Sequence, residues 1–311
     1  MQELSIRERI LEFIKTLPEV VSVKAYGSSI AYQSGYKANE KKQVDLIVIV
    51  EDIKKFYEEN LKKNKYMYKF TPRLYFKHAS KAKLKKAAGI CYTTDINYGI
   101  DTYKMGVIEK EDVLEDLLNW KTYYIAGRFQ KEMFTAVEDK EIEKANELNK
   151  KNALTIALLL LDKEKPKLID LYEQICSLSY MGDSRKSFKA EDPNKIKKLA
   201  SGSKEHFNKE YKDKTDLFKT DKNEYITIDY KKVHKMIKYL PEKLRANIME
   251  AVGEDNSLDK VEEIREVIKK YLTTIIKGSS SGQTKKGILT TGPKNSISYA
   301  ISKLKKGRKK M

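Results

Sequence analysis

The sequence has only two cysteines, Cys91 and Cys176, and only three histidines among 311 residues. Two distant cysteines form no disulfide framework, and the histidines show no zinc-ligand spacing, so a reducing compartment is expected. The longest nearly continuous apolar run, residues 153–161, has nine residues, whereas a membrane-spanning helix needs about 20. The N-terminal residues carry charges where an export signal is apolar, which predicts a cytoplasmic protein.

Acidic residues are too few to balance the basic ones. The chain has 63 Lys and Arg against 45 Asp and Glu, a net charge of +18. Such a surplus indicates an anionic partner, namely nucleic acid, a nucleotide or anionic lipid. A second interpretation is genome base composition, because 55 of the basic residues are Lys. The segment from Lys277 to the end carries ten basic residues and no acidic one.

Apolar periodicity predicts an α+β protein. We expect a mixed-sheet domain over residues 1–135, a mostly helical domain over 136–276 and a basic C-terminal segment over 277–311. The Gly/Ser-containing segment 278–287 is expected to be a loop. The predicted helices cover residues 6–17, 53–63, 111–124, 141–161, 167–180 and 261–277, and the predicted strands cover 20–26, 43–50, 89–100, 102–108 and 224–230.

A glycine–serine turn between two strands is the main chemical signal of the first half. Gly27 lets the backbone approach phosphate oxygens, and the hydroxyl of Ser28 donates to them. Asp45 on the following strand is suited to hold Mg²⁺ against a triphosphate. This layout is typical of nucleotidyltransferases. Gly-Ser pairs are nevertheless common, and a strand Asp also occurs as a capping or exposed residue.

A second carboxylate is missing from its usual place. Nucleotidyltransferases usually carry acids at i and i+2 of this strand, but Ile47 occupies i+2 here. Glu51 has the parity of Asp45 but lies six residues on, about 20 Å away along a strand. Asp95 and Asp101 are the remaining candidates in this half, and both also fit exposed turns.

Several longer stretches together resemble one family, the mitochondrial-type CDP-diacylglycerol synthases, also called translocator assembly and maintenance proteins, which have bacterial relatives. Residues 116–131, DLLNWKTYYIAGRFQK, and residues 177–199, beginning SLSYMGDSRK, carry the most specific motifs. Further matches occur, in the family's order, at residues 26–33, 44–52, 103–108, the Asn152-containing helix and 282–292.

The resemblance implies a nucleotidyltransferase-fold domain, a winged-helix-like domain and a C-terminal helical element. It implies a Mg²⁺-dependent enzyme that joins CTP and phosphatidate into CDP-diacylglycerol and pyrophosphate. Carried onto this sequence, it implies catalytic roles for Asp45, Lys104, Arg128, Asp183 and Arg185, substrate binding by Tyr26, Gly27, Ser28, Ser29, Gln33, Lys131 and Lys195, and metal binding by Asp45 and Asp183, with Asp95 a candidate.

The sequence departs from the family in three places. Ser29 stands where a third glycine is common, Glu132 where a proline is common, and YKMG at residues 103–106 where IKYG is common. None of these changes removes a charge, so they bear on substrate geometry. Two motif segments also have simpler interpretations: Gly182-Asp183 as a helix-ending turn, and residues 191–195 as a helix start.

A lipid substrate without a spanning helix requires docking. Ile297, Ala300, Ile301 and Leu304 share one helical face within the basic tail, which predicts binding to an anionic membrane surface, at the inner face of the cell membrane. No nucleic-acid partner is expected. Two alternatives remain: a nucleotidyltransferase acting on an RNA end, a protein or a small molecule, and a non-catalytic nucleic-acid-binding protein.

Overall fold

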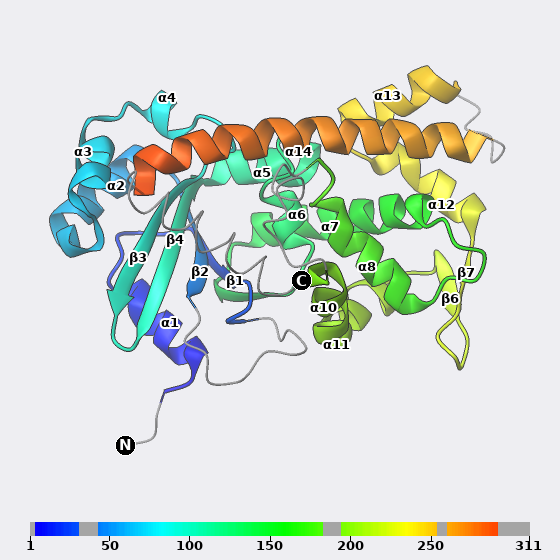
Figure 1. The fold of residues 1–311 in the computed structure, drawn as a ribbon, viewed down its shortest axis with the longest axis horizontal. Helices are drawn as coiled ribbons and strands as arrows, with labels where there is room; N and C mark the ends of the chain where they lie inside the picture. The colour runs from blue at the N-terminus through cyan, green and yellow to red at the C-terminus, as the bar shows by residue number, and fades with distance from the viewer. Residues whose placement is uncertain (1–3, 31–42, 183–193, 254–259, 292–311) are drawn as a thin grey trace.

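A five-stranded mixed sheet organises the first half of the protein in the computed structural model (Figure 1). The structure describes residues 4–30, 43–182, 194–253 and 260–291. The strand order is β3-β4-β2-β1-β5; β2 and β4 run parallel, and the other three pairings are antiparallel. The strands are β1 (Ser22–Tyr26), β2 (Val44–Val50), β3 (Cys91–Tyr98), β4 (Asp101–Glu109) and β5 (Met133–Val137). The predicted α+β class and mixed sheet are confirmed.

Strand β2 lies in the middle of the sheet and is buried on both faces. Val44, Leu46 and Val48 point into one apolar core, while Ile47 and Ile49 point into the other. Asp45 has the parity of Ile47 and is the only residue of the strand that is not fully buried. An almost continuous β-branched run therefore places one carboxylate at the start of a central strand.

One face of the sheet is covered by the N-terminal helices. Their apolar side chains, including Phe13, Tyr57 and Phe76, form a single core with that face. Ser5 and Glu8 form a capping box that fixes the start of the first helix. These helices are α1 (Ile6–Lys15), α2 (Ile53–Lys63), the 3₁₀ turn η1 (Lys65–Met67), α3 (Phe70–His78) and α4 (Lys81–Leu84).

The other face joins a larger core that continues through the helical half. That core combines Ile47 of the sheet with the buried run of α7 and with Ile268 and Leu272 of the last helix. Its elements are α5 (Lys110–Asn119), α6 (Ala126–Phe129), α7 (Lys140–Leu160), α8 (Leu168–Leu178), α10 (Lys195–Gly202), α11 (Lys204–Phe207), the π-helical turn η2 (Asn208–Lys212), the hairpin β6 (Phe218–Thr220) and β7 (Ile226–Ile228), α12 (Tyr230–Met236), the 3₁₀ turn η3 (Ile237–Tyr239), α13 (Glu242–Val252) and α14 (Val261–Thr291).

The predicted loop at residues 278–287 is wrong, because α14 continues through it as one helix of 31 residues. Tertiary contacts override the weak helix propensity of its glycines. The Gln283 amide donates to the Ile90 carbonyl at 3.0 Å, and the Lys286 ammonium donates to the Lys86 carbonyl at 3.0 Å. A Cβ on Gly282 would lie only 3.0 Å from the Cβ of Ala87, so a small residue allows this close approach.

The proposed domain boundaries fall inside elements, residue 135 within β5 and residue 276 within α14. Figure 1 shows α14 crossing from the helical half to the sheet half along one side of the molecule. In the described part of the chain, no helix combines the length and apolar character that a bilayer span requires. The basic helix expected at residues 297–304 lies outside the described residues.

Candidate active site

The glycine–serine turn and the strand aspartate meet at one corner of the sheet. Tyr26, the last residue of β1, pairs with Asp45 of β2 in the antiparallel register. Gly27 follows with φ +86°, and a Cβ there would lie 3.2 Å from Asp45 Oδ2. A side chain at position 27 would therefore be strained and would crowd the carboxylate. The Ser29 hydroxyl, one residue beyond Ser28, is buried and makes no hydrogen bond with described residues.

Lys104 and two tyrosines surround Asp45. The Lys104 ammonium lies 3.3 Å from Asp45 Oδ1, across the parallel β2–β4 pair, and 4.5 Å from the centre of the Tyr92 ring. The Tyr26 and Tyr92 hydroxyls are 3.4 Å apart. Burial, followed by the negative charge of Asp45, raises the pKa of Tyr26. Burial also raises the pKa of Tyr92, so both phenols stay neutral near pH 7 and act as hydrogen-bonding groups.

Arg128 projects from α6 over the rings of Tyr26 and Tyr124. Its guanidinium carbon lies 3.8 Å from the ring centre of Tyr124 and 5.9 Å from that of Tyr26. One guanidinium nitrogen also donates to the Tyr124 carbonyl. Stacking and this bond fix the plane of the guanidinium, which leaves its other N–H groups in a set direction for a phosphate.

Asp116, at 2% exposure, holds the turn that carries Arg128. Its Oδ1 accepts from the backbone N–H and the hydroxyl of Thr122 and from the Tyr123 N–H, at 2.6 to 2.8 Å. Its Oδ2 accepts from the N–H groups of Ile125 and Ala126 at 2.8 and 3.0 Å. One carboxylate thus satisfies five donors at the start of α6 and keeps the left-handed residue Tyr123 (φ 57°) in place.

We expect Asp116→Ala to lower the free energy of unfolding by roughly 3 kcal/mol or more, because buried N–H groups would lose their acceptor. Urea unfolding followed by circular dichroism measures this. Asp221→Ala is the matched control, since Asp221 also accepts from two backbone N–H groups but in an exposed turn; its cost should stay near 1 kcal/mol. Equal losses in both variants would contradict the special role of Asp116.

A second cationic cluster lies where α6 meets the end of α8. The Lys131 ammonium donates to the Ser179 hydroxyl at 2.5 Å and lies 4.9 Å from the centre of the Tyr180 ring. Lys195, the first residue of α10, approaches the same ring at 5.1 Å. Burial lowers the pKa of Lys131, and the charges of Lys195 and Arg128 lower it further. An anion bound here would relieve the repulsion between these cations.

The two most specific motif segments, residues 116–131 and 177–199, are therefore in contact. A Cβ on Gly127 would lie 2.7 Å from the Ser179 Cβ, so the glycine allows α6 to pack against the end of α8. Gly182 (φ +73°) packs in the same way against the backbone of Thr273 in α14. The structure thus brings together Tyr26, Gly27, Ser28, Ser29, Asp45, Lys104 and Arg128 at the corner, and Lys131 with Lys195 beside it.

Other predicted residues are placed elsewhere or are not described. Asp95 lies on β3, two strands from Asp45 and so about 10 Å across the sheet, and its carboxylate pairs with Lys69 at 3.3 Å. Asp101 pairs with Arg9 at 2.6 Å. The structure does not bring either acid to Asp45. Among described residues, no three acidic, His or Cys side chains form a metal-binding group. Gln33, Asp183 and Arg185 lie outside the described residues.

Sequence reasoning missed four residues that shape the site: Tyr92, Asp116, Tyr124 and Tyr180. Three of them carried a usable signal, since Asp116 and Tyr124 fall within the segment that contains Arg128, and Tyr180 falls within residues 177–199. Tyr92 is supplied by a separate strand, and only the β3–β4–β2 order brings it to Asp45. No local pattern in the sequence indicates that contact.

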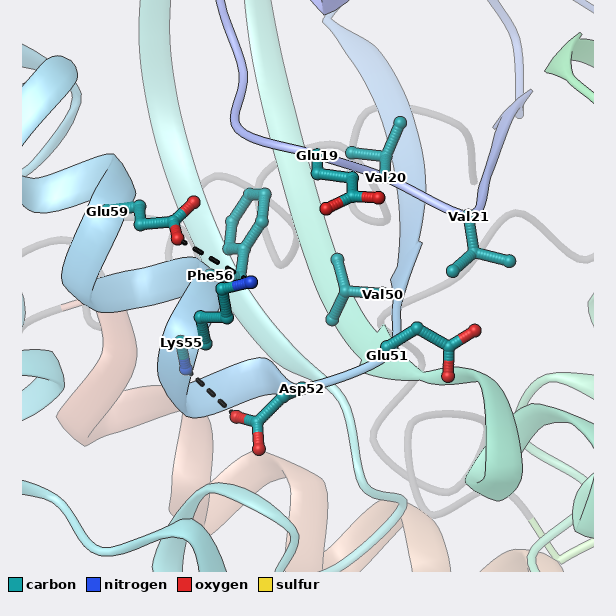
Figure 2. A pocket seen from close by; sticks show the side chains of 9 residues that line it. All are labelled: Glu19, Val20, Val21, Val50, Glu51, Asp52, Lys55, Phe56 and Glu59. Atoms are coloured by element: carbon teal, nitrogen blue, oxygen red, sulfur yellow. Dashed lines mark hydrogen bonds and ion pairs between the residues drawn. The ribbon is translucent and has the colours of Figure 1, made fainter.

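A small pocket at the opposite end of β2 is a poor alternative site (Figure 2). Glu19, Glu51, Asp52 and Glu59 surround it, and Lys55 is the single basic residue among its lining side chains. Lys55 lies 4.0 Å from Glu59. Clustered carboxylates repel a nucleotide triphosphate, so the Asp45 corner remains the candidate active site.

Comparison with known proteins identifies the family of the chain. The family model described as "Phosphatidate cytidylyltransferase, mitochondrial" matches residues 10–306. Proteins of that name are similar over nearly the whole chain: 30% identical in Schizosaccharomyces pombe, over 98% of this chain and 85% of the relative; 31% in Xenopus laevis, over 96% and 93%; and 30% in Mus musculus, over 93% and 91%. The chain therefore belongs to the mitochondrial-type phosphatidate cytidylyltransferase family.

Proposed function

We propose that this protein transfers the cytidylyl group of CTP to phosphatidate, forming CDP-diacylglycerol and releasing pyrophosphate. The name shared by the relatives states this activity for them. The observation that supports it most strongly in this chain is the union of the Gly27–Asp45 corner with Arg128 on one face of the sheet. This arrangement offers hydrogen-bond donors to both a nucleotide triphosphate and a second phosphate.

The acceptor needs little chemical activation. Phosphatidate ends in a phosphate monoester, whose second pKa is about 6, so its oxygen is already anionic near neutral pH. In the proposed step this oxygen forms a bond to the α-phosphorus while the bond to the bridging oxygen of the pyrophosphate breaks. A single carboxylate at the corner suits this chemistry, because no strong general base is required.

The chain's cations bring two anions together. Lys104 and Arg128 are positioned to neutralise charge at the α-phosphate, and Lys131 with Lys195 to hold the acceptor phosphate. The Gly27 turn and the Ser29 hydroxyl provide donors for the triphosphate. Positioning and charge neutralisation are the two contributions assigned to these residues.

Asp45 is the residue proposed to hold Mg²⁺. Mg²⁺ typically takes one or two carboxylates and fills its remaining positions with substrate phosphates and water. One accessible carboxylate beside a glycine without a Cβ fits that pattern. The bound ion would supply charge neutralisation at the triphosphate. The second ligand predicted at Asp183 stays a prediction.

Extraction of product into organic solvent tests the activity directly. The full chain is incubated with α-labelled CTP, Mg²⁺ and detergent-dispersed phosphatidate, and we expect label in the organic phase only when phosphatidate is present. Label appearing instead on RNA ends, or no transfer to any acceptor together with salt-sensitive RNA binding, would replace this proposal with one of the two alternatives.

Work on a membrane surface is part of the proposal, because phosphatidate resides in a bilayer. The cell-membrane location expected from the sequence finds no support in the relatives, whose names all state mitochondrial. We propose a peripheral enzyme at whichever membrane supplies the lipid. We also propose that the helical half, with its β6–β7 hairpin, is winged-helix-like.

Lys131→Met should raise the KM for phosphatidate about tenfold, with a smaller effect on the KM for CTP, because one charge-assisted contact to the acceptor phosphate is lost. Initial rates at varied concentrations of each substrate measure both constants. Lys238→Met is the control, since Lys238 also lies over a tyrosine, Tyr239, at 4.8 Å. A larger change in the KM for CTP than for phosphatidate would contradict the assignment.

A further inference from the structure

The excess positive charge of the chain is confined to two segments. Residues 60–94 contain ten Lys and Arg and no acidic residue, and residues 277–311 contain another ten and none. The positive charges of these two segments together exceed the net charge of +18, so the net charge of the rest of the chain is close to zero. Because the basic residues cluster in this way, genome base composition alone does not explain the excess positive charge.

The structure packs the described part of the second segment, residues 277–291, against the first segment. The second half of α14 lies along α3 and the loop after α4, where Gln283 bonds to the Ile90 carbonyl and Lys286 to the Lys86 carbonyl. Figure 1 shows this end of α14 beside α3. Neighbouring segments of like charge repel each other, and an anionic partner on their shared surface removes that cost.

Large apolar side chains are exposed within the first basic segment. Phe70 is 72% exposed, Tyr66 61% and Leu74 43%. Phe70 and Leu74 are four residues apart on α3 and share one face of the helix. Three such side chains within nine residues, together with the exposed lysines Lys65 and Lys69, form what we call the α3 surface. Isolated exposed apolar residues are ordinary, whereas a cluster marks an interaction site.

A lipid bilayer fits the α3 surface better than nucleic acid does. Interfacial helices place aromatic and aliphatic side chains among the acyl chains and direct lysines to lipid phosphates. Nucleic-acid recognition relies heavily on arginine, yet the only arginine of residues 60–94 is Arg73. Its guanidinium already donates to the Lys65 and Tyr68 carbonyls.

We propose that the α3 surface docks the protein on an anionic bilayer, with Tyr66, Phe70 and Leu74 entering the interfacial layer and the surrounding lysines contacting lipid phosphates. It adjoins the sheet that carries the site: Lys69 pairs with Asp95 on β3, the strand next to that of Lys104. The proposal rests on the proposed function only in that a lipid substrate gives the enzyme reason to approach a bilayer.

Vesicle flotation of the full chain tests this. The probe is phosphatidylcholine vesicles with or without phosphatidylglycerol; phosphatidate is omitted so that the active site contributes no binding. We expect binding only to the anionic vesicles. Phe70→Ala with Leu74→Ala should weaken it about tenfold or more, since two apolar anchors are removed. Ile100→Ala, at an equally exposed apolar residue in the β3–β4 turn, should leave binding unchanged.

A second measurement guards against misfolding of the double variant. Phe70→Trp keeps an apolar anchor, and its emission should shift to the blue and be quenched by brominated lipid when anionic vesicles are added. The single native tryptophan, Trp120, is fully buried and provides a constant background.

Three outcomes would overturn the proposal: equal binding by the double variant and the unaltered chain, absence of the blue shift, and loss of RNA binding rather than vesicle binding in the double variant. Turnover on detergent-dispersed phosphatidate is measured in parallel. If turnover is absent while vesicle binding still depends on Phe70, the proposed function is refuted and the docking surface is supported. If turnover is present while vesicle binding does not depend on Phe70, only the docking surface is refuted.

Discussion

Asp45→Asn should lower kcat by on the order of a thousandfold while leaving the fold intact, because the corner would lose the charge of the Asp45 carboxylate and with it the proposed anchor for Mg²⁺. The substitution keeps the shape of the side chain and removes its charge. Asp45 is partly exposed at the start of β2, so little stability should be lost. Turnover of labelled CTP at saturating Mg²⁺ and the thermal unfolding midpoint together measure the two effects.

Glu51→Gln is the matched control for Asp45→Asn. Glu51 follows the same strand at its other end, is exposed, and lines the acidic pocket of Figure 2. Its neutralisation should leave kcat within about twofold of the unaltered protein, as expected for an exposed residue remote from the site. Normal turnover by Asp45→Asn would contradict the metal-binding role of Asp45. A large loss of kcat in Glu51→Gln would indicate that the active site lies at the other end of β2.

Arg128→Lys should lower kcat/KM by about a hundredfold although the positive charge is kept. The planar guanidinium stacks on Tyr124 at 3.8 Å and is aimed by that contact, whereas an ammonium neither stacks in this way nor grips a phosphate with two donors. Losing one strong charge-assisted contact costs roughly 1.5 to 3 kcal/mol, and each 1.4 kcal/mol is tenfold. Steady-state kinetics with both substrates varied measures this loss.

A second arginine–aromatic pair provides the control for Arg128→Lys. Arg7 lies over the Phe134 ring at 5.2 Å, on the N-terminal helix. Arg7→Lys should leave kcat/KM unchanged, because Arg7 packs against a ring without approaching the corner. If Arg128→Lys retained full activity, the bidentate binding of phosphate assigned to Arg128 would be refuted. A positive charge in that region would then be sufficient for activity.

Strands β1 to β4 and helices α1 and α2 were predictable because local pattern and tertiary structure agree there, whereas β5, α3 and α4 were not predicted. The buried run of β2 and the capping signals around α1 and α2 specify those elements from short windows of sequence. The glycine–serine turn and Asp45 were predictable for the same reason, since a strand, a turn and a strand follow one another along the chain.

Long-range contacts explain what the sequence did not reveal. The glycines of α14 predict a loop, but bonds from Gln283 and Lys286 to the carbonyls of residues 90 and 86 hold that segment helical. Tyr92 and Tyr180 reach the site from β3 and from the end of α8, and their roles depend on the packing of elements distant in sequence. The hydrogen bonds that Asp116 accepts likewise could not be predicted, because they exist only once the turn around Tyr123 is formed.

Determination of the protein's structure with a non-hydrolysable CTP analogue, Mg²⁺ and a short-chain phosphatidate tests the central claim most directly. The account predicts the triphosphate at the Gly27 turn, the ion on Asp45, and the acceptor phosphate against Arg128 and Lys131. A triphosphate bound away from Gly27, or an acceptor phosphate out of reach of both Arg128 and Lys131, would contradict it.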